Sequence, residues 1–166
     1  MQHFIKALGM TTVLLASSAY AETVSFPKTA ALTYSGNGGV TATMGFNRST
    51  SNYNINTTFK IPLYSMQFRS SGGMNGNTMV PNSYSDTRRG KLYAQAKFNH
   101  GSKTITYGKA GENKTAPMRG VPMDLFSLAW QLALNNGKVS GVSQFTNGKK
   151  RSEEHTSELQ SPMFIS

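Results

Sequence analysis

The chain has 166 residues, of which 37% are hydrophobic and 14% charged, with a formal net charge of +10 and no cysteine. This length suits one domain with a sizeable core, and the missing cysteine excludes disulfides and thiolate chemistry. General acid–base and metal chemistry draw mainly on His, Asp and Glu, and the whole chain holds three His and seven acidic residues. We therefore expect no enzymatic activity and no cofactor.

Residues 1–21 have the pattern of a signal peptide. A modest positive region, a short apolar run and a small-x-small cleavage site follow one another at His3 and Lys6, Ala7 to Ala16, and Ala19-Tyr20-Ala21. An uncleaved anchor is the alternative, but the apolar run is short for one. The sequence predicts export to the periplasm with a mature N-terminus near Glu22.

Period-two alternation of apolar and polar residues predicts antiparallel strands through most of the chain. Pro62 is expected to interrupt the sheet, and the glycines of residues 72–77 to form a flexible loop. Pro117 and Pro122 are expected to bracket a rigid connection. The strands are expected at residues 30–35, 40–46, 53–61, 65–71, 82–88, 91–99, 103–107, 112–116 and 138–145.

Residues 123–135 are predicted to form the one helix. Asp124 can cap its first turn, and Gly137 can take the left-handed conformation that ends it. Its side chains are apolar on almost every side, so we expect other segments to wrap it. The predicted fold is mainly β, an antiparallel meander curled as a half-barrel or open barrel around this helix.

The last residues, 151–166, resemble the in-frame translation of a sequencing adapter, which predicts a non-native tail. The native part would then be a single β-rich envelope domain, residues 22–150, incomplete at its C-terminus. Asn147-Gly148 is a hairpin signal, and we expect its partner strand to be missing. Residues 22–150 hold 15 Lys and Arg against four Asp and Glu, a formal charge of +11.

An ordered set of short motifs resembles a bacterial exported family, the domain of unknown function 3108. The motifs are Arg69-Ser70-Ser71-Gly72-Gly73, Arg88-Arg89-Gly90-Lys91, Phe98-Asn99, Thr106-Tyr107-Gly108, Thr115-Ala116-Pro117 and Asp124-Leu125-Phe126-Ser127-Leu128. Two features depart from the family: Asn99 stands where Asp is frequent, and the last strands are absent. The resemblance implies a secreted antiparallel β domain and carries over no activity.

Six residues are candidate ligand contacts: Tyr64, Met66, Phe68, Arg88, Arg89 and Trp130. Arg88 and Arg89 lie at a predicted hairpin tip and could bind phosphate or carboxylate groups, although charges there also deter aggregation. Tyr64, Phe68 and Trp130 could line a cavity between sheet and helix or could fill it. Met66 is one of nine methionines, whose flexible thioethers suit adaptable apolar pockets as well as ordinary cores. His100 with Ser102 and Asp86 can be written as a hydrolytic triad, but no nucleophile-elbow motif supports it.

These features favour a non-enzymatic periplasmic protein that binds or carries an apolar, lipid-like ligand between curved sheet and helix. The expected partners are lipid, lipopolysaccharide or another envelope component, with peripheral membrane contact and without nucleic acid. The alternative is an interaction module that binds an envelope partner or an anionic glycan through its basic surface. The dispersed lysines are equally explained as a means of keeping the domain soluble.

Overall fold

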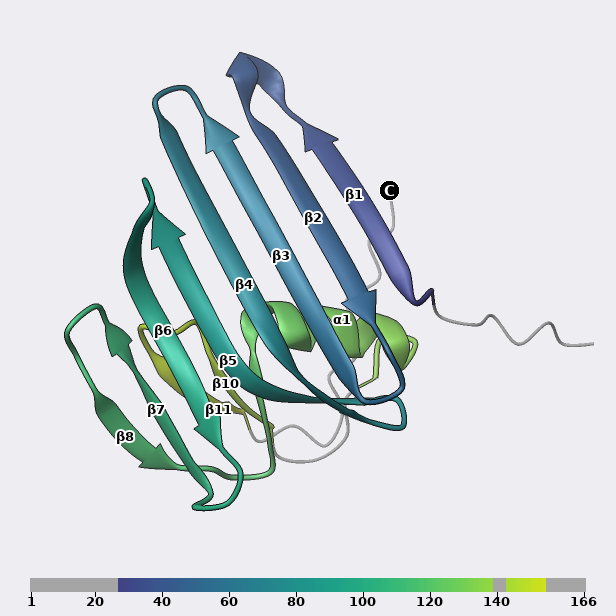
Figure 1. Ribbon diagram of the computed structural model, residues 1–166, viewed down its shortest axis with the longest axis vertical. Helices are drawn as coiled ribbons and strands as arrows, with labels where there is room; N and C mark the ends of the chain where they lie inside the picture. Colours follow the sequence, from purple (N-terminus) through teal and green to yellow (C-terminus); the bar gives the residue numbers. More distant parts are fainter. Residues whose placement is uncertain (1–26, 139–142, 155–166) are drawn as a thin grey trace, which may run out of the picture.

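The computed structural model describes residues 27–138 and 143–154, so the predicted signal peptide and most of the predicted tail lie outside the described residues. Eight antiparallel strands, β1 to β8, follow chain order in one sheet, and β11-β10-β9 form a second, smaller sheet (Figure 1). The strands are β1 Thr29–Ser35, β2 Thr41–Arg48, β3 Asn52–Ile61, β4 Tyr64–Asn75, β5 Thr78–Arg88, β6 Lys91–Asn99, β7 Thr104–Lys109, β8 Lys114–Pro117, β9 Val121–Asp124, β10 Ser143–Thr146 and β11 Arg151–Glu154, and the helix is α1 Leu125–Leu134.

The predicted mainly-β meander is confirmed. Each strand of the large sheet pairs with the next along the chain, and β1 and β8 are its two edges, so the sheet is curved but not closed. Pro62 falls, as predicted, in a break between strands, where Leu63 takes a φ of 63° and β4 begins one residue later. The period-two pattern therefore located most strands within a few residues.

The predicted flexible loop at residues 72–77 is wrong, because β4 continues through Gly72 and Gly73 to Asn75. The pairing of β4 with β5 shifts by one residue between Ser71 and Gly72, a β-bulge. A Cβ on Gly72 would lie 2.1 Å from the Val80 carbonyl oxygen. The glycine is there for close approach of two main chains, and only the short turn at Gly76 and Asn77 reverses the direction.

The predicted rigid connection before the helix contains a further strand. β9 includes Pro122 and pairs in parallel with β10, while β10 pairs antiparallel with β11 beyond Asn147-Gly148. The expectation that this hairpin lacks a partner strand is therefore wrong, because Arg151–Glu154 takes that place. Strand pairing uses main-chain groups, so four residues after a hairpin turn can pair whatever their side chains.

Asp124 caps α1 as predicted. Its carboxylate accepts from the main-chain N–H groups of Phe126 and Ser127, and the Ser127 hydroxyl accepts from the Asp124 N–H. At the other end Gly137 adopts a φ of 80°, and its N–H donates to the Leu132 carbonyl at 2.7 Å. Both helix boundaries thus follow from local chemistry that the sequence displays.

The predicted open half-barrel with one helix is confirmed, but the other segments cover the helix on one side only. α1 lies across the strands on one face of the large sheet, toward one end of β2 to β5 (Figure 1). Only Phe126, Ser127, Trp130 and Gln131 are buried, whereas Leu125 is 49% exposed and Ala129 and Ala133 are also exposed. The helix is therefore packed on one side, and its buried side includes its two polar residues. Among the described residues, no helix is long and apolar enough to span a membrane.

Candidate functional site

The helix-covered half of the concave sheet face is a closely packed aromatic core. Trp130 stacks on Phe46 of β2 with ring centroids 4.1 Å apart. One turn earlier, Phe126 lies 5.3 Å from Phe68 of β4 and 6.4 Å from Tyr84 of β5, again between ring centroids. These contacts occupy the space between helix and sheet, which the sequence analysis proposed as the ligand site.

Buried polar groups fasten the start of the helix to the sheet. The Ser70 hydroxyl donates to the Asp124 carboxylate at 2.6 Å, and the Tyr53 hydroxyl lies 3.2 Å from Ser70 Oγ. Burial raises the pKa of Asp124, an effect that its hydrogen bonds from Ser70, Ser127 and Phe126 partly offset. Burial, and then the Asp124 charge, likewise raise the pKa of the Tyr53 phenol. This network explains Asp124 and Ser127 as structural residues.

Gln131 fastens the middle of the helix to the β4–β5 turn. Its side-chain oxygen accepts from the Met79 N–H at 2.6 Å, and its side-chain NH₂ donates to the Asn77 carbonyl at 3.0 Å. The side-chain amide therefore serves two main-chain groups of the turn region, and Gln131 is only 2% exposed.

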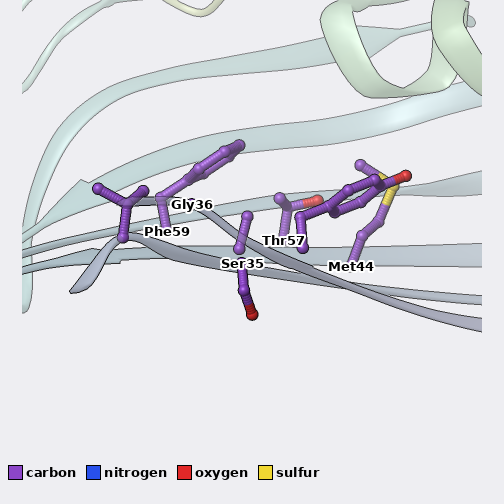
Figure 2. Close-up of a pocket in the computed structure, with 8 residues that line it drawn as sticks. Ser35, Gly36, Met44, Thr57 and Phe59 are labelled. Atoms are coloured by element: carbon purple, nitrogen blue, oxygen red, sulfur yellow. The ribbon is translucent and has the colours of Figure 1, made fainter. Parts of the chain in front are cut away.

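A cavity of about 450 Å³ lies on the other half of the same concave face. Its volume is within the range of small-molecule sites. Met44 and Thr57 are directly paired across β2 and β3, as are Ala42 and Phe59, and all four share a face with Phe46 and Ile55 of the core. Figure 2 shows Thr57 between Phe59 and Met44. The full lining is Tyr34, Ser35, Gly36, Val40, Ala42, Met44, Thr57 and Phe59, none of them charged.

The cavity wall continues into the helix-covered core through a chain of contacting aromatic rings. Phe59 lies edge-on to Phe68, with centroids 5.8 Å apart, and Phe68 in turn contacts Phe126 of the helix. On the opposite side, Tyr34 of the edge strand is 57% exposed. The cavity is thus a cleft closed on one side by the core and open toward solvent at β1.

None of the six predicted contacts is among the described residues that line this cavity. Trp130 is 8% exposed and fills the space under the helix, and Phe68 packs behind the cavity wall. Met66 is paired with Phe59, so it lies beside the cavity without lining it. Tyr64 and Arg89 lie away from the helix, where they line a separate depression beside the β3–β4 turn.

The predicted arginines have partners within the protein. Arg88 donates to the buried Asp86 carboxylate at 2.9 Å, and its guanidinium carbon lies 3.6 Å from the centre of the Tyr93 ring. The hydrogen bond that Arg88 donates to Asp86 raises the pKa of Arg88. Arg89 lies over the Tyr64 ring, with its guanidinium carbon 4.9 Å from the ring centre. Both arginines stabilise the end of the β5–β6 hairpin.

His100, Ser102 and Asp86, the residues considered for a hydrolytic triad, have other partners. His100 Nε2 lies 2.7 Å from the Pro81 carbonyl oxygen, Ser102 Oγ lies 2.7 Å from Thr104 Oγ1, and Asp86 is paired with Arg88. The geometry therefore gives no support to a hydrolytic site at His100.

One signal in the sequence pointed to the cavity. The inward-facing residues of β3 are Tyr53, Ile55, Thr57 and Phe59. At Thr57 this series has a hydroxyl-bearing side chain of about the size of valine. Thr57 is 1% exposed, and its Oγ1 atom has no hydrogen-bond partner among the described residues. A polar residue in a buried period-two series is unusual unless it has a partner.

Comparison with known proteins adds no relative. No protein-family model, no curated protein and no solved structure matches the chain.

Proposed function

We propose that this protein is a non-enzymatic periplasmic envelope protein that binds or carries an apolar, lipid-like ligand on the concave face of its curved sheet. The observation that supports the proposal most directly is the uncharged cavity of about 450 Å³ beside the aromatic core. Membership of the exported family named above belongs to the same proposal, since a secreted antiparallel β domain is what that resemblance implies.

The chemistry of the cavity wall favours an apolar occupant. Met44, Phe59 and Val40 present thioether, aromatic and aliphatic surface, and apolar ligands gain about 25 cal/mol for each Å² of such surface removed from water. A charged group would lose its hydration in a wall that offers no counter-charge. The methionine supplies side-chain flexibility that suits ligands of varied shape.

Filling the cavity tests the proposal. We expect the neutral apolar dye N-phenylnaphthylamine to bind the wild-type protein with a rise in fluorescence. The variant Ala42→Trp should not bind it, because the indole would occupy the cavity between Val40 and Phe59. Leu63→Trp is the matched control, since Leu63 is 97% exposed in the β3–β4 turn and its replacement leaves the cavity open.

Two results would contradict the proposal. One is equal dye binding by the wild-type protein and Ala42→Trp. The other is a double negative result: native mass spectrometry of gently purified protein finds no co-purifying apolar molecule, and the wild-type protein does not bind the dye.

A second candidate function is supported by the convex face. A polar depression of about 240 Å³ crosses β3 to β6, and Arg69 and Lys97 are among its lining residues, with no acidic residue in the wall. Such a surface suits an anionic glycan of the envelope. Salt-sensitive binding to an anionic polysaccharide, lost in Arg69→Gln/Lys97→Gln but kept in Lys103→Gln/Lys109→Gln, would favour this function, and binding unchanged by the first pair would reject it.

A further inference from the structure

We propose that the hydroxyl of Thr57 is the polar contact of the cavity, and that the ligand is an uncharged chain carrying an alcohol or carbonyl oxygen. This inference rests on the proposed function of the cavity. It adds a chemical class: fatty alcohols, ketones and esters rather than pure hydrocarbons or ionised fatty acids.

The first observation is the isolation of the Thr57 hydroxyl. Oγ1 exposes less than 1 Å² and has no hydrogen-bond partner among the described residues. Two other buried hydroxyls on this face are hydrogen-bonded: Ser70 donates to Asp124, and the Tyr53 hydroxyl lies within hydrogen-bond distance of Ser70 Oγ. Because buried polar groups in folded proteins nearly always have a partner, this exception calls for an explanation.

The second observation is where that hydroxyl lies. Thr57 belongs to the cavity wall, between Phe59 along β3 and Met44 across from it on β2 (Figure 2). A hydroxyl can both donate and accept, so it fits a carbonyl as well as an alcohol. Valine has the same shape without the oxygen, so packing alone gives no reason for threonine at this position.

The third observation concerns access. Because Oγ1 is covered, a ligand oxygen reaches it only when a neighbour moves. Met44 lies directly opposite Thr57 and is unbranched, with three rotatable bonds. Rotation of this side chain admits the ligand oxygen without a change in the sheet.

The lack of charge in the wall decides between neutral and ionised ligands. Tyr34, Ser35 and Thr57 are the polar side chains among the lining residues, and all are neutral hydroxyls. One hydroxyl cannot replace the hydration of a carboxylate, so an ionised head group would remain outside. The cavity should therefore prefer a neutral oxygen over a carboxylate on the same chain.

The test compares four probes of equal chain length: decane, decanol, decan-2-one and decanoate. Binding is measured by displacement of N-phenylnaphthylamine from the wild-type protein, Thr57→Ser, Thr57→Val and the control Thr58→Val. Thr58 is the next residue of β3 and points to the convex face, so its variant has the same chemical change outside the cavity.

We expect Thr57→Val to weaken the binding of decanol and of decan-2-one by about tenfold, the effect of one lost hydrogen bond. Decane should bind the wild-type protein and Thr57→Val equally. Thr57→Ser should still bind decanol and decan-2-one more tightly than decane, and Thr58→Val should bind all four probes as the wild type does. Decanoate should bind more weakly than decanol.

The failures are distinguishable. If decane, decanol and decan-2-one all bind but Thr57→Val changes none of them, the role of Thr57 is refuted while the proposed function stands. If no probe binds the wild-type protein, both are refuted. Tighter binding of decanoate than of decanol would refute the uncharged class.

Discussion

The two halves of the concave face share one sheet and one residue pattern, yet one is core and the other is a cleft. Phe46 and Met44 show the difference, because they lie two residues apart on β2 and point the same way. Phe46 is 2% exposed and stacks on Trp130, whereas Met44 is only partly buried and lines the cavity. The two halves differ because side chains of the helix cover Phe46, whereas no helix residue is among the described residues that line the cavity at Met44.

Truncating the two β2 residues is the strongest way to break this comparison. Phe46→Ala should lower the free energy of unfolding by about 3–5 kcal/mol, since it removes a buried ring and leaves a cavity under Trp130. Met44→Ala should cost only about 1 kcal/mol, because the side chain already borders open space. Chemical denaturation of both variants measures the difference, and equal losses would mean that the two halves are equally packed.

The next effect concerns the bulge that carries β4 under the helix-covered half. Gly72→Ala should destabilise the protein by about 2–3 kcal/mol, because the added Cβ would approach the Val80 carbonyl oxygen to 2.1 Å. Gly73→Ala is the matched control, since a Cβ there meets its nearest atom, Ser51 O, at 3.6 Å. Thermal unfolding of the two variants checks the prediction, and a loss in Gly73→Ala as large as that in Gly72→Ala would contradict it.

A smaller effect of opposite sign is expected in the open half. Thr57→Val should raise the free energy of unfolding of the ligand-free protein by about 1 kcal/mol, because it removes a buried hydroxyl without a partner among the described residues. Thr58→Val, on the convex face, should have little effect. If Thr57→Val instead destabilises the protein, the hydroxyl has a partner in the ligand-free state.

The most subtle effect is on pH dependence at the helix cap. An acid with a raised pKa in the folded state stabilises the fold below its ordinary pKa of 3.8, and that contribution is lost as the pH rises through the folded value. The stability of the wild type relative to Asp124→Asn should therefore fall as the pH rises above 3.8.

Glu112 provides a control with the reverse sign. The hydrogen bond from Lys114 lowers the pKa of this exposed carboxylate, so its contribution is present above the ordinary pKa and lost as the pH falls. Wild-type stability relative to Glu112→Gln should rise as the pH is raised toward 4.5, the ordinary pKa of the group, and should then stay level. Denaturation at a series of pH values checks both slopes, and a rising slope for Asp124 would show that its hydrogen bonds outweigh its burial.

Local chemistry made much of the fold predictable. The alternation of Ile55, Thr57 and Phe59 located a strand and its inward face, and Asp124 and Gly137 marked both ends of the helix. Each of these signals acts within a few residues of itself, through side-chain direction, capping or backbone conformation.

The site could not be predicted in the same way, because its position depends on which helix side faces the sheet. A helix that is apolar almost all round gives no periodic signal for this choice. The deciding residues are its polar ones, since Ser127 and Gln131 turn inward to meet Asp124, Asn77 and Met79. Gly72 was mispredicted for a related reason. Its role is a close approach to the main chain of Val80, which is distant in sequence, and a glycine-rich stretch looks like a loop when that neighbour is unknown.

The bond between Gln131 and Met79 gives the molecule a built-in reporter. The Met79 N–H donates to a side chain of the helix, so its exchange with solvent deuterium requires the helix to lift from the sheet. Main-chain N–H groups deep in the β3–β4 ladder exchange only when the sheet itself opens. The ratio of these two exchange rates would therefore measure how often the helix undocks while the sheet remains intact.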